Sequence, residues 1–181
     1  MTFNPWQSLL ESARAGGEWA WAEIYQTYAP KVRGYVAAQG VGDPDNLVGE
    51  VFLQAVRNVH RFAGNEQGFR SWLFTIAHRR VLDERRRVQR KPEQLMAELF
   101  DRATVSTAED LALDGLGNHW LRAGLESLTS EQKSVLALRV IADLSVEEVA
   151  RIIGKRPGAV KALQHRALGR LRKTLAQPVS K

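Results

Sequence analysis

The sequence contains no cysteine, which excludes disulfide bonds and thiolate metal sites. Its histidines show no metal-ligand spacing, and each is expected to be a surface or contact residue: His60, His78, His119 and His165. There is no glycine-rich phosphate loop, nucleophile elbow or carboxylate cluster, so we predict that the chain is not an enzyme and binds no cofactor or metal. No apolar run could cross a membrane and no signal-peptide pattern follows Met1, which predicts a cytoplasmic protein without membrane insertion.

Negative charge is missing from the C-terminal end of the chain. The 181 residues carry a formal net charge of +6, and from Val149 onward there are nine lysines or arginines and no aspartate or glutamate. A helix face that is merely solvated usually mixes the two signs. The excess therefore predicts a polyanionic partner, and nucleic acid is the first candidate.

Residues 128–173 have the pattern of a helix-turn-helix. Thr129 with Gln132, and Ser145 with Glu148, have the spacing of capping boxes, so a helix is expected to begin after each. The helices so begun carry apolar residues at helical spacing, first Val135, Leu136, Leu138 and Ile141, then Val146, Val149, Ile152 and Ile153.

A third helix of this unit is predicted to begin at Pro157. Gly154 suits the left-handed position that ends the preceding helix, and proline suits a first helical position because its missing N–H would have no partner there. One side of the new helix is an apolar stripe of Val160, Leu163, Ala167, Leu171 and Leu175. Its other side is basic and polar, as expected of a recognition helix that enters a DNA major groove.

The N-terminal half is also predicted to be helical. One helix begins near Gly17 with Trp21, Ile24, Tyr28, Val32 and Tyr35 on its apolar face. A second opens at Asp43 and Pro44 with Val48, Val51, Phe52, Ala55 and Val59 inside. After a polar loop at 61–68, a third runs from about residue 68 to 87. Its beginning is aromatic, with Trp72 and Phe74 assigned to the core or its rim, and its end is rich in arginine.

An acidic stretch separates the two basic halves. Residues 92–131 hold eight acidic residues and two basic ones, and the polar segment 89–107 is the predicted linker. We therefore predict an all-α chain of two small helical domains, at 1–88 and 108–181, joined by a flexible, acidic connection.

Three segments in this order resemble the extracytoplasmic-function (ECF) class of bacterial sigma factors, the promoter-specificity subunits of RNA polymerase. Residues 43–56 resemble the family's segment that binds the polymerase clamp helices. Residues 69–87 resemble its segment for the −10 promoter element, and 128–175 resemble region 4, which binds the −35 element. The resemblance covers residues 6–175 and implies a region 2 domain followed by a region 4 helix-turn-helix domain.

The resemblance implies a non-catalytic factor that directs promoter recognition and transcription initiation, and is nucleoid-associated when bound to polymerase. Its partners would be core RNA polymerase, promoter DNA and, as a candidate, an anti-sigma factor. The expected polymerase contacts are Asp45, Leu47, Glu50 and Phe52, presented partly outward, although Phe52 could equally be core. The expected −10 contacts are Asn65, Arg79, Arg80, Arg86 and Arg87. The expected −35 contacts are Arg156, Lys161, Gln164, His165 and Arg166.

The chain departs from the family pattern at two places. Asn46 and Gly49 stand where the family usually has an aspartate and a glutamine, which removes polar groups from the clamp-binding face. His78 and Arg79 stand where the family tends to have arginine and asparagine, so details of −10 recognition do not carry over there.

Two other classes stay open at this point. One is a two-domain helix-turn-helix transcription regulator that does not depend on core polymerase, which a pull-down with the core enzyme would distinguish. The other is an RNA-binding or anti-termination protein, which lacks support because no RNA-recognition sheet motif is present.

Overall fold

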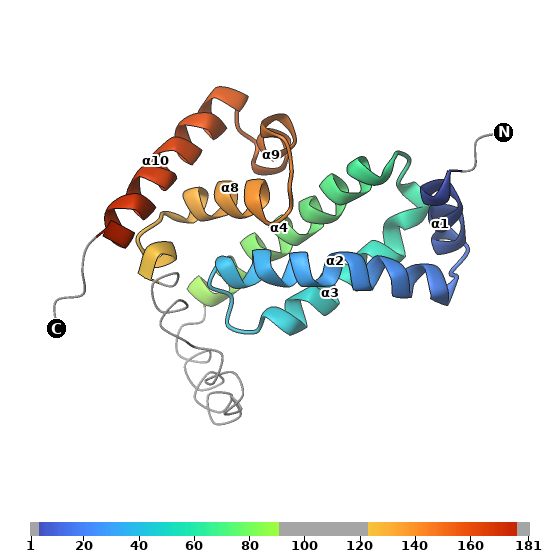
Figure 1. Cartoon of the computed structure of the whole chain (residues 1–181). Coiled ribbons are helices and arrows are strands. Elements are labelled where there is room, and N and C mark those ends of the chain that lie inside the picture. The colour runs from blue at the N-terminus through green and yellow to red at the C-terminus, as the bar shows by residue number, and fades with distance from the viewer. Residues whose placement is uncertain (1–3, 91–122, 177–181) are drawn as a thin grey trace.

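The computed structural model describes residues 4–90 and 123–176, and none of these forms a strand (Figure 1). The N-terminal domain holds α1 (Pro5–Arg14), α2 (Glu18–Ala38), α3 (Pro44–Asn58), the 3-10 helix η1 (Val59–Arg61) and α4 (Glu66–Arg90). The C-terminal domain holds α8 (Ser130–Val140), α9 (Val146–Ile153) and α10 (Pro157–Ala176). The predicted all-α fold of two helical domains is confirmed. Gln89 and Arg90 belong to α4, and the rest of the predicted linker, 91–107, lies outside the described residues.

The helix-turn-helix follows its local sequence signals closely. Both capping boxes are formed, at Thr129 before α8 and at Ser145 before α9. Gly154 ends α9 in the left-handed conformation, with φ 66°, which a residue with a side chain would adopt less readily. Pro157 is the first residue of α10, as its position in the sequence predicts.

Helix α1 was not expected from the sequence. The Asn4 side chain accepts a hydrogen bond from the backbone N–H of Trp6 at 3.1 Å, and Pro5 follows directly as the first helical residue. The same order, a capping side chain and then proline, opens α3 at Asp43 and Pro44. That signal stands in the sequence at residues 4 and 5 and could have identified α1.

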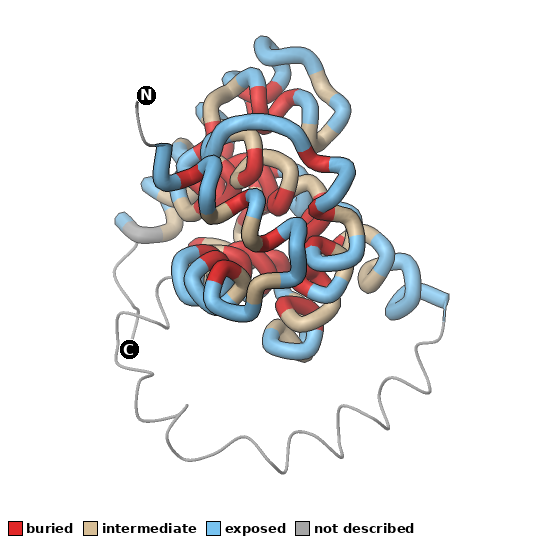
Figure 2. Tube along the Cα trace, turned by 90° about the vertical axis from the view of Figure 1, so that its right-hand side faces the viewer, coloured by how far each residue is buried: buried red, intermediate tan, exposed pale blue. Residues whose placement is uncertain are grey.

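The core of the N-terminal domain is aromatic and aliphatic, and buried positions gather along the inner faces of its helices (Figure 2). Phe74 is fully buried and Trp72 is half-buried, which confirms their assignment to the core and its rim. The largest fully buried side chains of this domain are Tyr35, Phe69, Phe74, Leu10, Ile24 and Leu73.

The two domains pack against each other, α8 on α2 and α9 on α4. One hydrophobic cluster contains core residues of both. A methyl group added at Gly34 of α2 would lie 3.4 Å from Cγ2 of Ile141, so the α2 backbone packs closely against the Ile141 side chain there. Hydrogen bonds also connect the two domains. The Ser134 hydroxyl of α8 donates to Oε1 of Gln39 at 3.0 Å, and Arg85 of α4 donates to the same oxygen at 2.8 Å.

His78 lies in the interior, so the expectation that it is a surface residue is wrong. It is 7% exposed, and its Nδ1 lies 2.7 Å from the Tyr35 hydroxyl, which joins α4 to α2 by a hydrogen bond. Burial, and secondarily the nearby Arg85 charge, lowers the pKa of His78 to about 4. The ring is therefore neutral at pH 7.

Candidate nucleic-acid interface

The outer face of α10 carries the predicted −35 contacts. Arg156, Lys161, His165 and Arg166 are exposed, and Gln164 is half-buried at the edge of the face. Lys161, Gln164 and His165 are spaced by three and four residues and so share one side of the helix. The neighbouring Lys155 is paired with Glu131 at 2.8 Å, whereas none of the described carboxylates forms an ion pair with Arg156, Lys161 or Arg166.

The inner face of α10 determines that these residues point outward. Val160 and Ala167 are fully buried and Leu163 is nearly so, which fixes the rotation of α10 against α8 and α9. The outer face of α10 thus forms a long polar and basic surface of the C-terminal domain. Such a surface can hold phosphates through lysine and arginine and contact base edges through side chains that enter the groove.

A hollow of about 510 Å³ beside α10 extends the basic surface toward the start of α8. His165 and Arg166 line it together with Arg170 and Lys173, two basic residues that were not among the predicted contacts. Arg170 also donates to the carbonyl of Ser127 at 3.2 Å. The run of basic residues without acidic ones was the sequence signal that could have included both.

The loop before α4 is shorter than predicted. Residue 61 ends η1 and residue 66 begins α4, so only residues 62–65 are non-helical where the sequence predicted a loop over 61–68. Asn65 is exposed, and its side-chain oxygen accepts the backbone N–H of Gly68 at 2.8 Å. It therefore caps the first turn of α4 while facing solvent.

The arginines of α4 do not form one free basic face. Arg79 is exposed, and no described carboxylate forms an ion pair with it. Arg80 turns toward α3, where it donates to Gln54 at 2.9 Å and lies 3.6 Å from Glu50. The last two predicted −10 arginines form ion pairs one turn back along α4, an exposed one between Arg86 and Asp83 and a bidentate one between Arg87 and the half-buried Glu84. An exposed pair is worth about 1 kcal/mol or less, so Arg86 can exchange its pair for phosphate.

Two predicted polymerase contacts on α3 face the core. Leu47 is 4% exposed, so the expectation that it points partly outward is wrong. Phe52 is 6% exposed with its ring 4.7 Å from that of Tyr25, so of the two alternatives left open for it the core position is the one observed. Asp45 is exposed and paired with Arg33 at 2.8 Å. Glu50 is half-buried.

The outer face of α3 also carries two apolar residues that the sequence reasoning missed. Leu53 is 58% exposed and Val56 is 46% exposed. Leu53 follows Glu50 by three residues and Val56 follows Leu53 by three, so each adjoins the one before it along the outer surface of the helix. The spacing that puts Val48, Val51, Phe52 and Ala55 inside already left them outside, and a mixed polar and apolar surface of this kind suits a protein partner.

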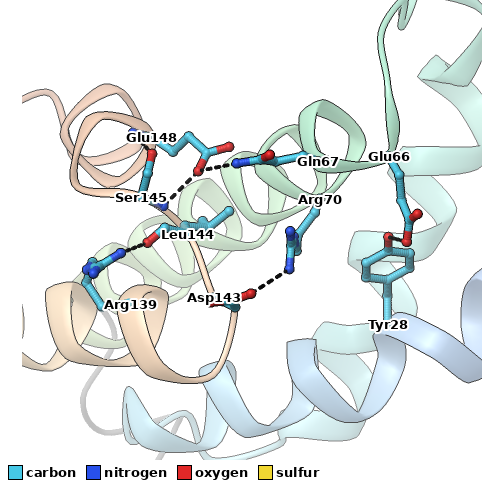
Figure 3. A network of polar contacts seen from close by, with 9 residues as sticks. All are labelled: Tyr28, Glu66, Gln67, Arg70, Arg139, Asp143, Leu144, Ser145 and Glu148. Atoms are coloured by element: carbon cyan, nitrogen blue, oxygen red, sulfur yellow. Dashed lines mark hydrogen bonds and ion pairs between the residues drawn. The ribbon is translucent and has the colours of Figure 1, made fainter.

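A polar network connects α4 with the C-terminal domain (Figure 3). Gln67 donates to Glu148 at 3.4 Å and Arg70 is paired with Asp143 at 3.2 Å. Burial raises the pKa of Glu148, but hydrogen bonds from Ser145 and Gln67 and the charge of Arg151 outweigh it and lower this pKa below its usual value. Glu148 thus serves both the cap of α9 and the contact between the domains.

Two family models match the sequence. The model described as Sigma-70 region 2 matches residues 24–91, and the model described as Sigma-70, region 4 matches residues 124–173. The first match contains α3, the loop at 62–65 and the whole of α4. The second contains α8, α9 and most of α10.

Curated relatives match nearly the whole chain. The ECF RNA polymerase sigma factor BldN of Streptomyces coelicolor is 34% identical over 170 residues, which are 92% of this chain and 64% of BldN. The ECF RNA polymerase sigma factor SigD of Mycobacterium tuberculosis is 31% identical over 173 residues, 91% of this chain and 81% of SigD. The chain thus spans just under two thirds of BldN and about four fifths of SigD.

A solved structure has the same fold. The sigma factor RpoE from Bartonella quintana, in complex with the anti-sigma factor NepR, aligns with a TM-score of 0.65 over 88% of this chain and 98% of RpoE.

None of the described helices is both long and apolar enough to span a membrane.

Proposed function

Since the chain belongs to the ECF RNA polymerase sigma factors, we propose that it binds core RNA polymerase and directs it to promoters by contacting two DNA elements. The observation that carries this proposal is the basic outer face of α10, which has no ion-pair partner among the described carboxylates at Arg156, Lys161 or Arg166. The chain contributes no catalytic group, since the polymerase performs the chemistry. A regulator independent of core polymerase is not favoured, because the region 2 match covers the helix that would bind the enzyme.

In the proposed −35 complex, α10 enters the major groove of duplex DNA. Arg156, Lys161 and Arg166 hold phosphates, and Gln164 and His165 contact base edges. Arg170 and Lys173 extend the phosphate contacts along the backbone, beside the hollow between α8 and α10. Affinity should therefore depend steeply on salt, as it does when counterions are released from DNA.

In the proposed −10 complex, the loop at 62–65 receives a base that has left the stack of the opening duplex. Extruding a base costs a few kcal/mol, and least when the strand is already single. Asn65 and its neighbours contact that base, while Arg79, Arg86 and Arg87 follow the phosphates. Arg80, which faces α3, is better suited to orient Glu50 than to bind DNA.

Core polymerase is proposed to contact the outer face of α3. Asp45 and Glu50 supply charge, and Leu53 and Val56 supply exposed apolar area. Asn46 lies in the same stretch and its amide donates to Glu50 at 3.3 Å, so the departure from aspartate leaves a polar surface. Leu47 and Phe52 support this face from beneath.

An anti-sigma factor is proposed as a further partner. The support is the likeness in fold to RpoE of Bartonella quintana, which was solved with the anti-sigma factor NepR. Co-expression with candidate small partners, followed by size-exclusion chromatography, would detect a stable complex.

Run-off transcription tests the main proposal. Purified core polymerase is combined with the chain on a library of promoter fragments, and the transcripts are sequenced. We expect a defined set of start sites that appears only with the chain present, and that weakens uniformly with Lys161→Ala. Identical transcripts with and without the chain would exclude the sigma-factor role.

A further inference from the structure

The loop at 62–65 is held by two hydrogen bonds from α1. The indole Nε1 of Trp6 donates to the carbonyl of Gly64 at 3.1 Å, and the guanidinium of Arg14 donates to the carbonyl of Phe62. The partners are separated by 58 and 48 residues in the sequence, so these are tertiary contacts. Ala63 and Asn65, which alternate with the two held carbonyls, are exposed.

Aromatic rings fill the space beneath the same loop. The Trp6 ring lies 5.1 Å from Phe69, and the Phe62 ring lies 5.5 Å from Phe69 in an edge-on arrangement. The Phe62 ring is also 5.4 Å from Trp72. A methyl group added at Gly64 would be only 3.0 Å from Phe62, so the loop backbone rests directly on that ring. The carbonyls of the loop are therefore hydrogen-bonded to α1, and its backbone packs on a cluster of aromatic rings.

Helix α1 is itself fastened to α2. The indole Nε1 of Trp21 donates to the carbonyl of Ala13 at 3.0 Å, and the N–H of Gly17 donates to the carbonyl of Ser12 at 2.8 Å. Leu10 and Ala13 are buried in the domain core. Trp6 and Arg14, whose side chains donate to the loop, thus belong to a helix that is held in place by the rest of the domain.

We infer that Trp6 and Arg14 are positioning residues for base recognition by this loop. By holding the carbonyls of Phe62 and Gly64 inward, they keep the alternating positions, Ala63 and Asn65, toward the DNA strand. The inference rests on the proposed role of the loop in the −10 complex. Without the donors, the carbonyls are free to turn outward, and the loop then samples several conformations, of which only some match one base.

The chain offers a matched pair of variants for the test. Trp6→Phe removes the N–H that reaches the loop and keeps a ring against Phe69. Trp21→Phe removes an indole hydrogen bond of the same kind, which fastens α1 to α2 through the carbonyl of Ala13 and does not itself reach the loop. Trp21→Phe therefore shows how much base discrimination changes when only the attachment of α1 to α2 is weakened.

The measurement uses the full chain bound to core polymerase. A randomised library of single-stranded oligonucleotides first identifies the −10 sequence that the wild-type holoenzyme selects. Fluorescence anisotropy then gives the affinity for that oligonucleotide and for its three single-base alternatives at the most discriminated position. We expect Trp6→Phe to lower the discrimination ratio about fivefold, the factor that corresponds to one hydrogen bond of ordinary net strength. Arg14→Met should act in the same direction, and Arg14→Lys should retain most of the ratio.

The outcomes separate this inference from the proposed function. A ratio that stays at the wild-type value in Trp6→Phe, or that falls equally in Trp21→Phe, overturns the positioning role. Asn65→Ser keeps an acceptor for the cap of α4 and changes the exposed amide. If Asn65→Ser lowers the ratio and Trp6→Phe does not, only the positioning role is lost. If neither variant changes the ratio, the loop does not recognise the base and both proposals fail. Thermal melting of each variant shows whether the fold is retained.

Discussion

Acidification should destabilise the folded chain through one buried imidazole. His78 is 7% exposed between α4 and α2 and hydrogen-bonded to Tyr35, and its burial, with the nearby charge of Arg85, keeps it neutral by lowering its pKa. Burial lowers its pKa to about 4 in the folded chain, whereas a histidine in an unfolded chain has a pKa of about 6.5. Between these values the unfolded chain binds a proton that the folded chain does not. The free energy of unfolding therefore falls as the pH falls.

The size of the loss follows from the two pKa values. At about 1.4 kcal/mol per pH unit, the full loss between pH 6.5 and pH 4 is about 3 kcal/mol. At pH 5 it is about 2 kcal/mol, because the proton uptake of the folded state has hardly begun there. A domain of ordinary stability has about 5–15 kcal/mol in total, so this loss is readily measured.

Urea unfolding followed by circular dichroism between pH 7.5 and 4.5 measures the effect. The control is His78→Asn, which does not titrate and still offers a polar group to Tyr35. Carboxylates such as Glu148 titrate in both proteins, so they cancel in the difference. We expect the wild type to lose about 2 kcal/mol more than the variant between pH 7.5 and pH 5. Parallel pH profiles would refute the reasoning, since His78 would then titrate at its usual pKa.

Four further substitutions test other parts of the structure. Lys161→Ala should weaken binding to −35 duplex DNA of every sequence and lower the slope of log affinity against log salt by about one, as measured by anisotropy; an unchanged slope would remove Lys161 from the phosphate contacts. Glu50→Lys should reduce binding to core polymerase in a pull-down while the fold is retained, with a small loss of stability because the contacts of Glu50 with Arg80 and Asn46 are lost; binding equal to wild type would locate the contact elsewhere. Gly49→Gln should raise the free energy of unfolding by up to about 1 kcal/mol and keep or strengthen polymerase binding, because nothing lies within 4 Å of a methyl group added there; a loss of stability would contradict this. Ser145→Ala should cost about 1 kcal/mol in urea unfolding through the lost cap of α9, and no change would mean that water replaces the cap.

The parts of the fold that were predicted correctly depend on local chemistry. The capping boxes at Thr129 and Ser145, the left-handed Gly154 and the proline that begins α10 each act within one turn of the chain. Such signals can be identified from the sequence because their partners are three or four residues away. The exposure of the α10 face followed for the same reason, from its apolar stripe.

The parts that were missed depend on tertiary packing. His78 is polar and sits in an arginine-rich helix, yet α2 covers it and Tyr35 satisfies it. Arg80 belongs to the same arginine run but reaches α3. The support that Trp6 gives the loop joins residues 58 positions apart. Periodicity carries no information about such contacts. Leu53 differs, since the helical spacing of α3 already assigned it to the outside.

The close approach of α2 and α8 at Gly34 bears on the design of chimaeric sigma factors. Exchanging the C-terminal domain for that of a relative changes the DNA contacts and also replaces Ile141, whose methyl group would lie 3.4 Å from any side chain begun at residue 34. Alanine at position 34 would touch this neighbour, and a larger residue would displace it. Compatibility between exchanged domains therefore depends in part on this contact, where glycine at position 34 leaves room for the side chain at position 141.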